Sequence, residues 1–212
     1  MAPPTPARLT RLAYAALLAF ASITTLGAAP VGAGSERAEA RAAASLTTPI
    51  RIDNFGRISN TYYRGAQPEG DDYTALAALG VKTVINLTSD DALAEEPGMV
   101  AGAGMKYVAI PMTTRVAPTT EQLSRFLSIV NDPASQPVYV HCVGGKHRTG
   151  VMTAVYRMTQ HAWTPDKAFG EMKQFKFGAD FLHPEFKKFV YAYKVPAPAP
   201  GLPTVLAVQA GT

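Results

Sequence analysis

The chain has a single cysteine, Cys142, among its 212 residues. One cysteine excludes an internal disulfide. A lone cysteine is often a buried, inert side chain that packs as a small hydrophobe. In an oxidising compartment, however, an unpaired thiol is a liability unless it has a task. The residues around Cys142 therefore decide between these two interpretations.

The chain also has little excess charge of either sign. It contains 20 Lys and Arg against 16 Asp and Glu, a formal net charge of +4. Residues 1–33 contain Arg8 and Arg11 and no acidic residue, so the remainder carries 18 basic and 16 acidic residues. A net charge of +2 is too mild to indicate binding to nucleic acid or to an anionic membrane.

No apolar run near the start reaches the roughly 20 residues that span a bilayer. The run from Leu12 to Leu26 follows two arginines and precedes the small residues Val31, Gly32 and Ala33. This order of basic, apolar and small residues is typical of a secretory signal peptide. We expect residues 1–33 to be a signal, with export to the periplasm or secretion and no stable membrane insertion after cleavage. An uncleaved anchor is the alternative.

The remaining chain has room for one globular domain and shows no internal repeat. Residues 34–49 are rich in Ala, Arg and Glu, as a linker is. We expect the domain to cover residues 50–194 and to be a monomer. Residues 195–212 are rich in Pro and Ala without periodicity, which predicts a disordered tail.

Within the domain, apolar strand patterns alternate with helical ones. Strands are expected near residues 60–64, 81–87, 105–110 and 138–140. Helices are expected near residues 71–79, 119–130, 148–161 and 184–194, with a weaker one over 91–104 that is broken near Pro97. This alternation predicts an α/β fold, a three-layer sandwich with a mainly parallel central sheet flanked by helices.

The segment from His141 to Gly150 joins one such strand to one such helix. Its sequence, HCVGGKHRTG, places five residues between Cys142 and Arg148. The first turn of a helix has unpartnered N–H groups and a positive dipole end. Two consecutive glycines let the backbone N–H groups converge on one point, so the loop is expected to bind a phosphate. The phosphate-binding residues are expected to be Val143, Gly144, Gly145, Lys146, His147 and Arg148.

In such a loop, Arg148 can grip two phosphate oxygens and Cys142 lies beneath the phosphorus. The N–H groups and Arg148 favour the thiolate, which is the nucleophilic form. The expected reaction has two steps: Cys142 attacks phosphorus to form a cysteinyl-phosphate, and water then releases phosphate. Thr149 either assists the sulfur as it leaves or only satisfies backbone groups at the helix start.

The loop resembles the signature of the protein tyrosine phosphatase superfamily, in its compact dual-specificity branch. The stretch from Gly145 to Gly150 is similar to atypical plant and fungal phosphatases that act on inositol pyrophosphates. The stretches YRGAQP at residues 63–68 and VINL at residues 84–87 also look like parts of this branch. The resemblance implies a Cys142 nucleophile, an Arg148 clamp, a phosphorylated substrate, and neither metal nor other cofactor.

One part of the family pattern is missing. Members usually supply a general-acid Asp from a loop some thirty to forty residues before the cysteine, but this chain has no acidic residue between Glu96 and Glu121. Three hypotheses remain open. Asp90 or Asp91 swings over the site, His147 donates the proton, or the leaving group needs no strong acid.

Two other functions also fit a cysteine in an anion-binding loop. One is sulfur transfer of the rhodanese type, which the Arg-Thr-Gly after the five-residue gap disfavours. The other is a catalytically retired module that binds phosphate esters. The pattern favours a phosphatase for phosphate monoesters, and the substrate class, phosphoprotein or inositol phosphate, stays open.

Overall fold

The computed structural model describes residues 50–89 and 91–196. The strands are β1 (Gly56–Ser59), β2 (Tyr62–Gly65), β3 (Thr83–Asn86), β4 (Lys106–Ala109) and β5 (Val138–His141). The helices are α2 (Asp72–Ala78), α3 (Glu96–Gly102), α4 (Thr120–Val130), α5 (Arg148–Gln160), α6 (Pro165–Gln174), the 3-10 turn η1 (Asp180–Leu182) and α7 (Pro184–Ala192). Among these residues, no helix is both long and apolar enough to cross a membrane.

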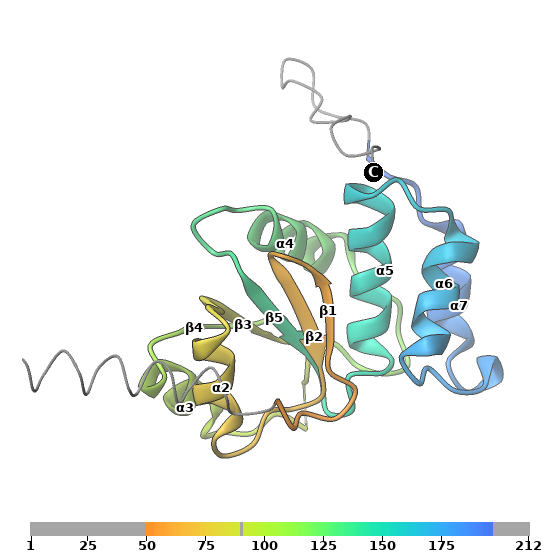
Figure 1. Ribbon diagram of the computed structural model, residues 1–212. Helices are drawn as coiled ribbons and strands as arrows, with labels where there is room; N and C mark the ends of the chain where they lie inside the picture. Colours follow the sequence, from red (N-terminus) through yellow and green to blue (C-terminus); the bar gives the residue numbers. More distant parts are fainter. Residues whose placement is uncertain (1–49, 90, 197–212) are drawn as a thin grey trace, which may run out of the picture.

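The strands form one sheet in the order β1-β2-β5-β3-β4. Only β1 and β2 are antiparallel, while β2, β5, β3 and β4 are all parallel to one another. Helices α2 and α3 lie on one side of the sheet, and α4 to α7 lie on the other (Figure 1). The predicted α/β sandwich with a mainly parallel sheet is thus confirmed.

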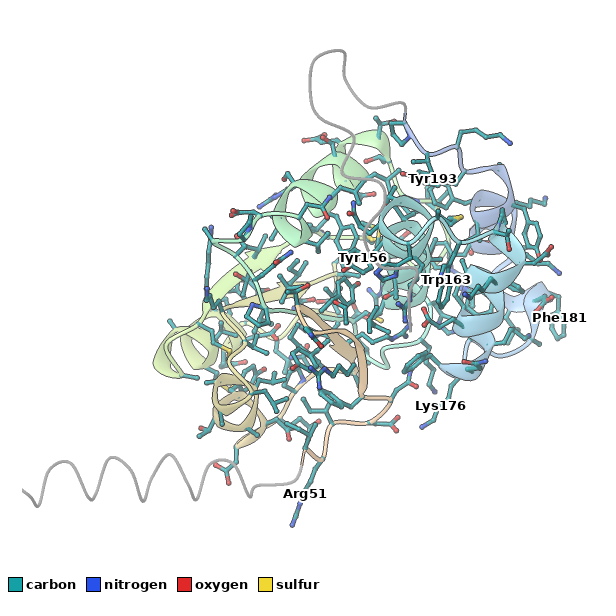
Figure 2. All side chains as sticks on the ribbon, turned by 45° about the horizontal axis from the view of Figure 1, so that its top comes forward. Arg51, Tyr156, Trp163, Lys176, Phe181 and Tyr193 are labelled. Atoms are coloured by element: carbon teal, nitrogen blue, oxygen red, sulfur yellow. The ribbon has the colours of Figure 1, made fainter. Side chains whose placement is uncertain are left out.

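Alternating side chains of the central strand β5 separate the two halves of the core. Val138 and Val140 belong to the cluster under α4 to α7, whereas Tyr139 belongs to the cluster under α2 and α3. All three are 0% exposed, as expected for a strand that is covered on both faces. Side chains fill both layers, while Phe181 of η1 points away from the body of the molecule (Figure 2).

Two local expectations were wrong. No strand was expected over residues 56–59, yet β1 forms the sheet edge and makes a hairpin with β2. Pro97 was expected to break a helix, but it lies in the first turn of α3, where its missing N–H would have had no helical partner. Helix α4 begins with a capping box, in which the side chains of Thr119 and Gln122 each accept a hydrogen bond from the other residue's backbone N–H.

Candidate active site

The loop between β5 and α5 places Cys142 and Arg148 at adjacent ends of two packed elements. Cys142 directly follows β5, Arg148 is the first residue of α5, and each is only 3% exposed. Cys142 belongs to the apolar cluster under α5. The pKa of Arg148 is raised against the effect of burial, first by its hydrogen bond with Asp91 and then by negative charge on Cys142. The sulfur therefore lies at the floor of the loop, between the core and the guanidinium.

The carbonyl groups of this loop are hydrogen-bonded to the surrounding chain. The carbonyl of Val143 accepts from the N–H of Gln67 at 3.1 Å. The side-chain amide of Asn54 donates to the carbonyls of Gly144 and Gly145 at 3.3 and 2.8 Å. Three consecutive carbonyls are thus held by neighbouring donors, as expected of a loop whose N–H groups converge on an anion.

Gly145 shows why the loop needs glycine. Its φ of +62° lies in the left-handed region, and a Cβ there would come within 2.3 Å of the backbone carbon of Gly65. At Gly144, by contrast, the nearest atoms to an added Cβ belong to the flexible side chain of Lys146, at 3.4 Å. Of the two glycines, Gly145 is therefore the one that needs to lack a side chain for the loop to pack against the end of β2.

Asp91 holds the guanidinium of Arg148 from the opposite side. Its two carboxylate oxygens accept hydrogen bonds from Nη1 and Nη2 at 2.9 and 2.7 Å, and Nη1 also donates to the carbonyl of Met112. The hydrogen bond from Arg148 is the main reason that the pKa of Asp91 is lowered. Within the described part of the chain, Nε of Arg148 and the hydroxyl of Thr149 are buried without a hydrogen-bond partner.

The three acid candidates are placed very differently. Asp91 reaches the arginine of the loop, with 43% of its side chain exposed. Asp90 lies outside the described residues. The imidazole of His147 is 3.0 Å from the carbonyl of Phe177 and its ring centroid is 3.8 Å from that of His183, so it is engaged with the α6–α7 region. Burial, with the charge of His183, lowers the pKa of His147.

A buried carboxylate that sequence reasoning missed supports the strand end from behind. Glu96 of α3 and His141 of β5 are both 0% exposed, and Oε1 of Glu96 is 2.9 Å from Nε2 of His141. Glu96 also accepts hydrogen bonds from Gln67 and Asn86. Burial alone would raise the pKa of Glu96. The interactions with His141, Gln67 and Asn86 outweigh burial, so the pKa is lowered. No motif marks Glu96, because its partners, which also include Tyr73 of α2, come from separate parts of the chain.

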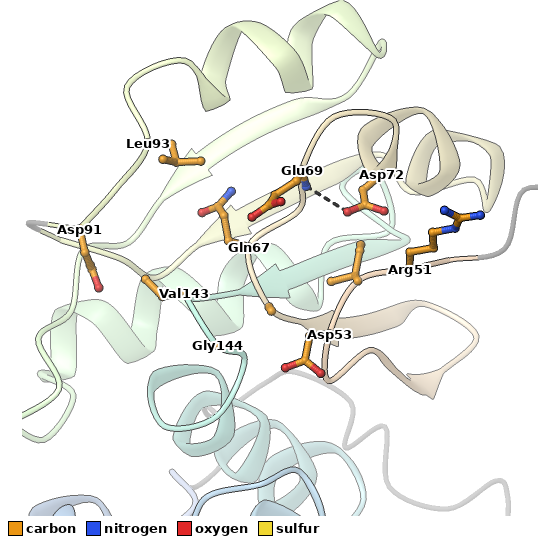
Figure 3. Close-up of a pocket in the computed structure, with 11 residues that line it drawn as sticks. Arg51, Asp53, Gln67, Glu69, Asp72, Asp91, Leu93, Val143 and Gly144 are labelled. Carbon is orange, nitrogen blue, oxygen red and sulfur yellow. Dashed lines mark hydrogen bonds between the residues drawn. The ribbon is translucent and has the colours of Figure 1, made fainter.

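A pocket of about 470 Å³ opens beside the loop. Val143, Gly144 and Asp91 line its inner side, and Arg51 lies across it from Asp91 (Figure 3). Its other charged residues are acidic: Asp53, Glu69 and Asp72. Asp53 pairs with Lys176, whereas no salt bridge among the described residues involves Glu69 or Asp72. The described residues contain no group of three side chains suited to hold a metal ion.

Comparison with known proteins gives the family. A family model described as "DSP-PTPase phosphatase fused to NAD+ Kinase" matches residues 53–184, more than half of the chain. The chain belongs to this family of cysteine-based phosphatases, as the resemblance of its loop implied. The alternatives of a sulfurtransferase and a retired binding module are not favoured.

Individual relatives show the same relationship. The dual specificity protein phosphatase TpbA of Pseudomonas aeruginosa (strain UCBPP-PA14) is 32% identical over 156 residues, covering 72% of this chain and 70% of TpbA. Inositol diphosphatase SIW14 of Saccharomyces cerevisiae is 29% identical over 133 residues, covering 60% of this chain and 47% of SIW14. A crystal structure of a TpbA variant in complex with pTyr aligns with a TM-score of 0.58 at 27% identity, covering 69% of this chain and 87% of that one.

Proposed function

We propose that this phosphatase hydrolyses phosphotyrosine on proteins, with Asp91 as the general acid. Three further side chains take part: Cys142 attacks phosphorus, Arg148 binds the equatorial oxygens, and Thr149 assists the sulfur as leaving group in the second step. The observation that carries the proposal is the contact of Asp91 with Arg148, because it places a carboxylate next to the position of a bound phosphoryl group.

The contact also gives Asp91 a way to become an acid. Its carboxylate is held ionised while it accepts both hydrogen bonds from Arg148. A phosphoryl group that binds Arg148 takes over these donors and brings negative charge beside Asp91. Both changes favour the protonated carboxyl, which can then donate to the leaving-group oxygen.

The acidic pocket favours a peptide over an inositol polyphosphate. Glu69 and Asp72 line the pocket beside the loop, and we propose that the leaving group extends into this pocket. Additional phosphates on that group would face like charge, whereas a tyrosine side chain in a peptide would not. The pTyr complex of the TpbA variant supports the same substrate class.

Inositol phosphates are the second candidate, since SIW14 is an inositol diphosphatase and Lys146 adds a positive charge to the loop. Comparing kcat/KM for a phosphotyrosine peptide and for an inositol pyrophosphate tests the choice. We expect a higher kcat/KM for the peptide than for the inositol pyrophosphate. Glu69→Lys should reduce the ratio of these two values. Asp71→Lys is the matched control, because Asp71 does not line the pocket. A preference for the inositol substrate in the unaltered chain would overturn the proposal.

We also propose that the protein acts outside the cytoplasm as a soluble monomer. The order of basic, apolar and small residues over 1–33 supports export. Cell fractionation and the mass of the mature chain test this, with a new N-terminus expected at Gly34. A full-length chain in the membrane fraction would contradict it, and size-exclusion chromatography would test the monomer.

A further inference from the structure

Arg64 of β2 is a buried arginine without a carboxylate partner in the described part of the chain. It is 0% exposed. Its Nη2 donates to the carbonyl of Gly145, its Cζ lies 4.1 Å from the centroid of the Phe175 ring, and its Nε and Nη1 have no hydrogen-bond partner there. The other two buried or nearly buried arginines, Arg148 and Arg157, pair with Asp91 and Glu171.

Such an arrangement is costly unless a negative charge lies nearby. A guanidinium stays protonated in proteins, and removing an uncompensated charge from water costs several kcal/mol. One carbonyl and one aromatic face offset only part of this cost. The position of Arg64 therefore indicates an anionic partner.

Burial lowers the pKa of Arg64, and the groups whose negative charge would act most strongly against this are Tyr62, Cys142, Glu171 and Tyr139. Burial raises the pKa of both tyrosines well above the usual value, so both phenols are neutral. Glu171 is already held by Arg157, which donates to both of its carboxylate oxygens. Cys142 is the remaining group that could supply a negative charge, as the thiolate.

Strand pairing explains why Arg64 lies beneath the loop. Arg64 is in parallel register with Val140 of β5, two residues before Cys142. Burial lowers the pKa of Arg64, and negative charge on Cys142 acts in the opposite direction. The guanidinium can therefore favour the thiolate through space while its hydrogen bond holds the carbonyl of Gly145 away from the phosphate.

We propose that Arg64 is a positioning residue that stabilises the Cys142 thiolate and holds the phosphate loop in its anion-binding shape. Arg148 acts on the sulfur from the substrate side, and Arg64 acts from the sheet side. The proposal concerns the same site as the proposed function, but it does not depend on which phosphate ester is the substrate.

The test compares Arg64→Lys, which keeps the charge, with Arg64→Gln, which keeps a hydrogen-bond donor and loses the charge. The readout is the pH dependence of Cys142 alkylation by iodoacetamide, which needs no substrate. We expect Arg64→Gln to slow alkylation about tenfold near pH 6 and to move the midpoint of the profile up by about one pH unit. Arg64→Lys should restore most of this shift.

Equal midpoints for Arg64→Gln and the unaltered chain would overturn the proposal, as would equal shifts in both variants. Arg157→Gln is the control, since it also removes an arginine from an ion pair, and it should lower Tm without moving the midpoint. Failure of the proposed substrate assignment would change neither profile, so the two outcomes are distinguishable.

A second measurement applies if Arg64→Gln does not fold. Nitrogen-15 NMR of the arginine Nε groups should show the Arg64 resonance moving on Cys142→Ser at neutral pH, while the Arg157 resonance stays in place. An unmoved Arg64 resonance would show that the guanidinium does not sense the charge on the sulfur, and it would overturn the proposal.

Discussion

Asp91 and Arg148 face each other across the mouth of the phosphate loop, joined by two hydrogen bonds of 2.9 and 2.7 Å. This contact supports Asp91 as the proposed acid. Asp91 reaches the arginine that we propose binds the phosphate, whereas His147 is engaged by the carbonyl of Phe177.

Replacement of the proposed acid should depend on the leaving group. We expect Asp91→Asn to lower kcat about 10²-fold or more for an alkyl phosphate or phosphotyrosine. For an aryl phosphate with a strongly acidic phenol, the loss should be below about tenfold, because that leaving group needs no proton. Steady-state kinetics with both substrates measure the difference.

Asp90→Asn and His147→Gln are the comparison variants for this prediction. Neither should show the same dependence on the leaving group. If His147→Gln or Asp90→Asn reproduces it while Asp91→Asn does not, the acid is another residue and the ion pair with Arg148 only holds the loop.

Alanine substitutions at the two loop glycines should have very different effects on activity. Gly145→Ala puts a Cβ within 2.3 Å of the Gly65 backbone at a φ of +62°, so we expect more than about a hundredfold loss of kcat/KM as the loop is displaced. Gly144→Ala meets only the side chain of Lys146 and should retain activity within about tenfold. Similar losses at both positions would contradict the packing described.

Breaking the buried contact of Glu96 should be costly. Glu96→Gln places an amide donor among the donors of Gln67 and Asn86 and beside the imidazole of His141, and we expect about 3 kcal/mol less stability in urea unfolding. The exposed neighbour supplies the control: Glu95→Gln should change little. The pKa of Glu96 is lowered in the folded chain from its ordinary 4.5. Its contribution is therefore present above about pH 4.5 and is lost as pH falls through the folded value. An equal urea midpoint for Glu96→Gln and the unaltered chain at neutral pH would count against the network.

Stability should also fall on mild acidification because of His147. Its pKa is lowered from the ordinary 6.5, chiefly by burial, so the unfolded chain binds the proton more readily and stability declines as pH falls below about 6.5. When the pH is lowered from about 7.5 to about 5.5, the Tm of every form should fall. The fall for His147→Gln should be roughly 2 °C smaller than the fall for the unaltered chain. His161, whose pKa is also lowered, contributes separately, and His161→Gln measures its share. Parallel Tm curves for His147→Gln and the unaltered chain would contradict this assignment.

Mild oxidation of Cys142 should inactivate the enzyme reversibly. Mild peroxide converts a thiolate to the sulfenic acid, and added thiol reverses this step. No second cysteine exists in the chain to form an internal disulfide, so longer exposure should make the loss permanent. The measurement is residual activity after timed peroxide treatment, with and without dithiothreitol. Full resistance to peroxide would indicate a protonated or shielded sulfur.

Local patterns were enough to predict the strand and helix on either side of the loop. Apolar residues at 138–140 and the helix after Arg148 lie where the sequence placed them, since both depend on neighbours in the chain. Arg64, Asn54 and Glu96 were not predicted as supports, because their contacts depend on the strand order. The placement of β5 between β2 and β3 brings these distant residues together, and nothing local encodes that order.

Asp91 illustrates the same limit. The sequence made Asp91, Asp90 and His147 equal candidates for the acid. Which of them lies close enough to the phosphate site depends on the folded structure. The loop after β3 carries Asp91 to the end of the neighbouring strand β5, where Arg148 begins the next helix. The contact with Arg148 is the reason we propose Asp91 rather than His147, while Asp90 lies outside the described residues.

The most direct test of this account is to trap the intermediate on the sulfur. Asp91→Asn should be mixed with an activated aryl phosphate, quenched in acid within the first turnover, and digested for mass spectrometry. The account predicts one phosphoryl group on the peptide that contains Cys142, absent from Cys142→Ser. Turnover in Cys142→Ser, or a phosphoryl group on any other residue, would contradict it.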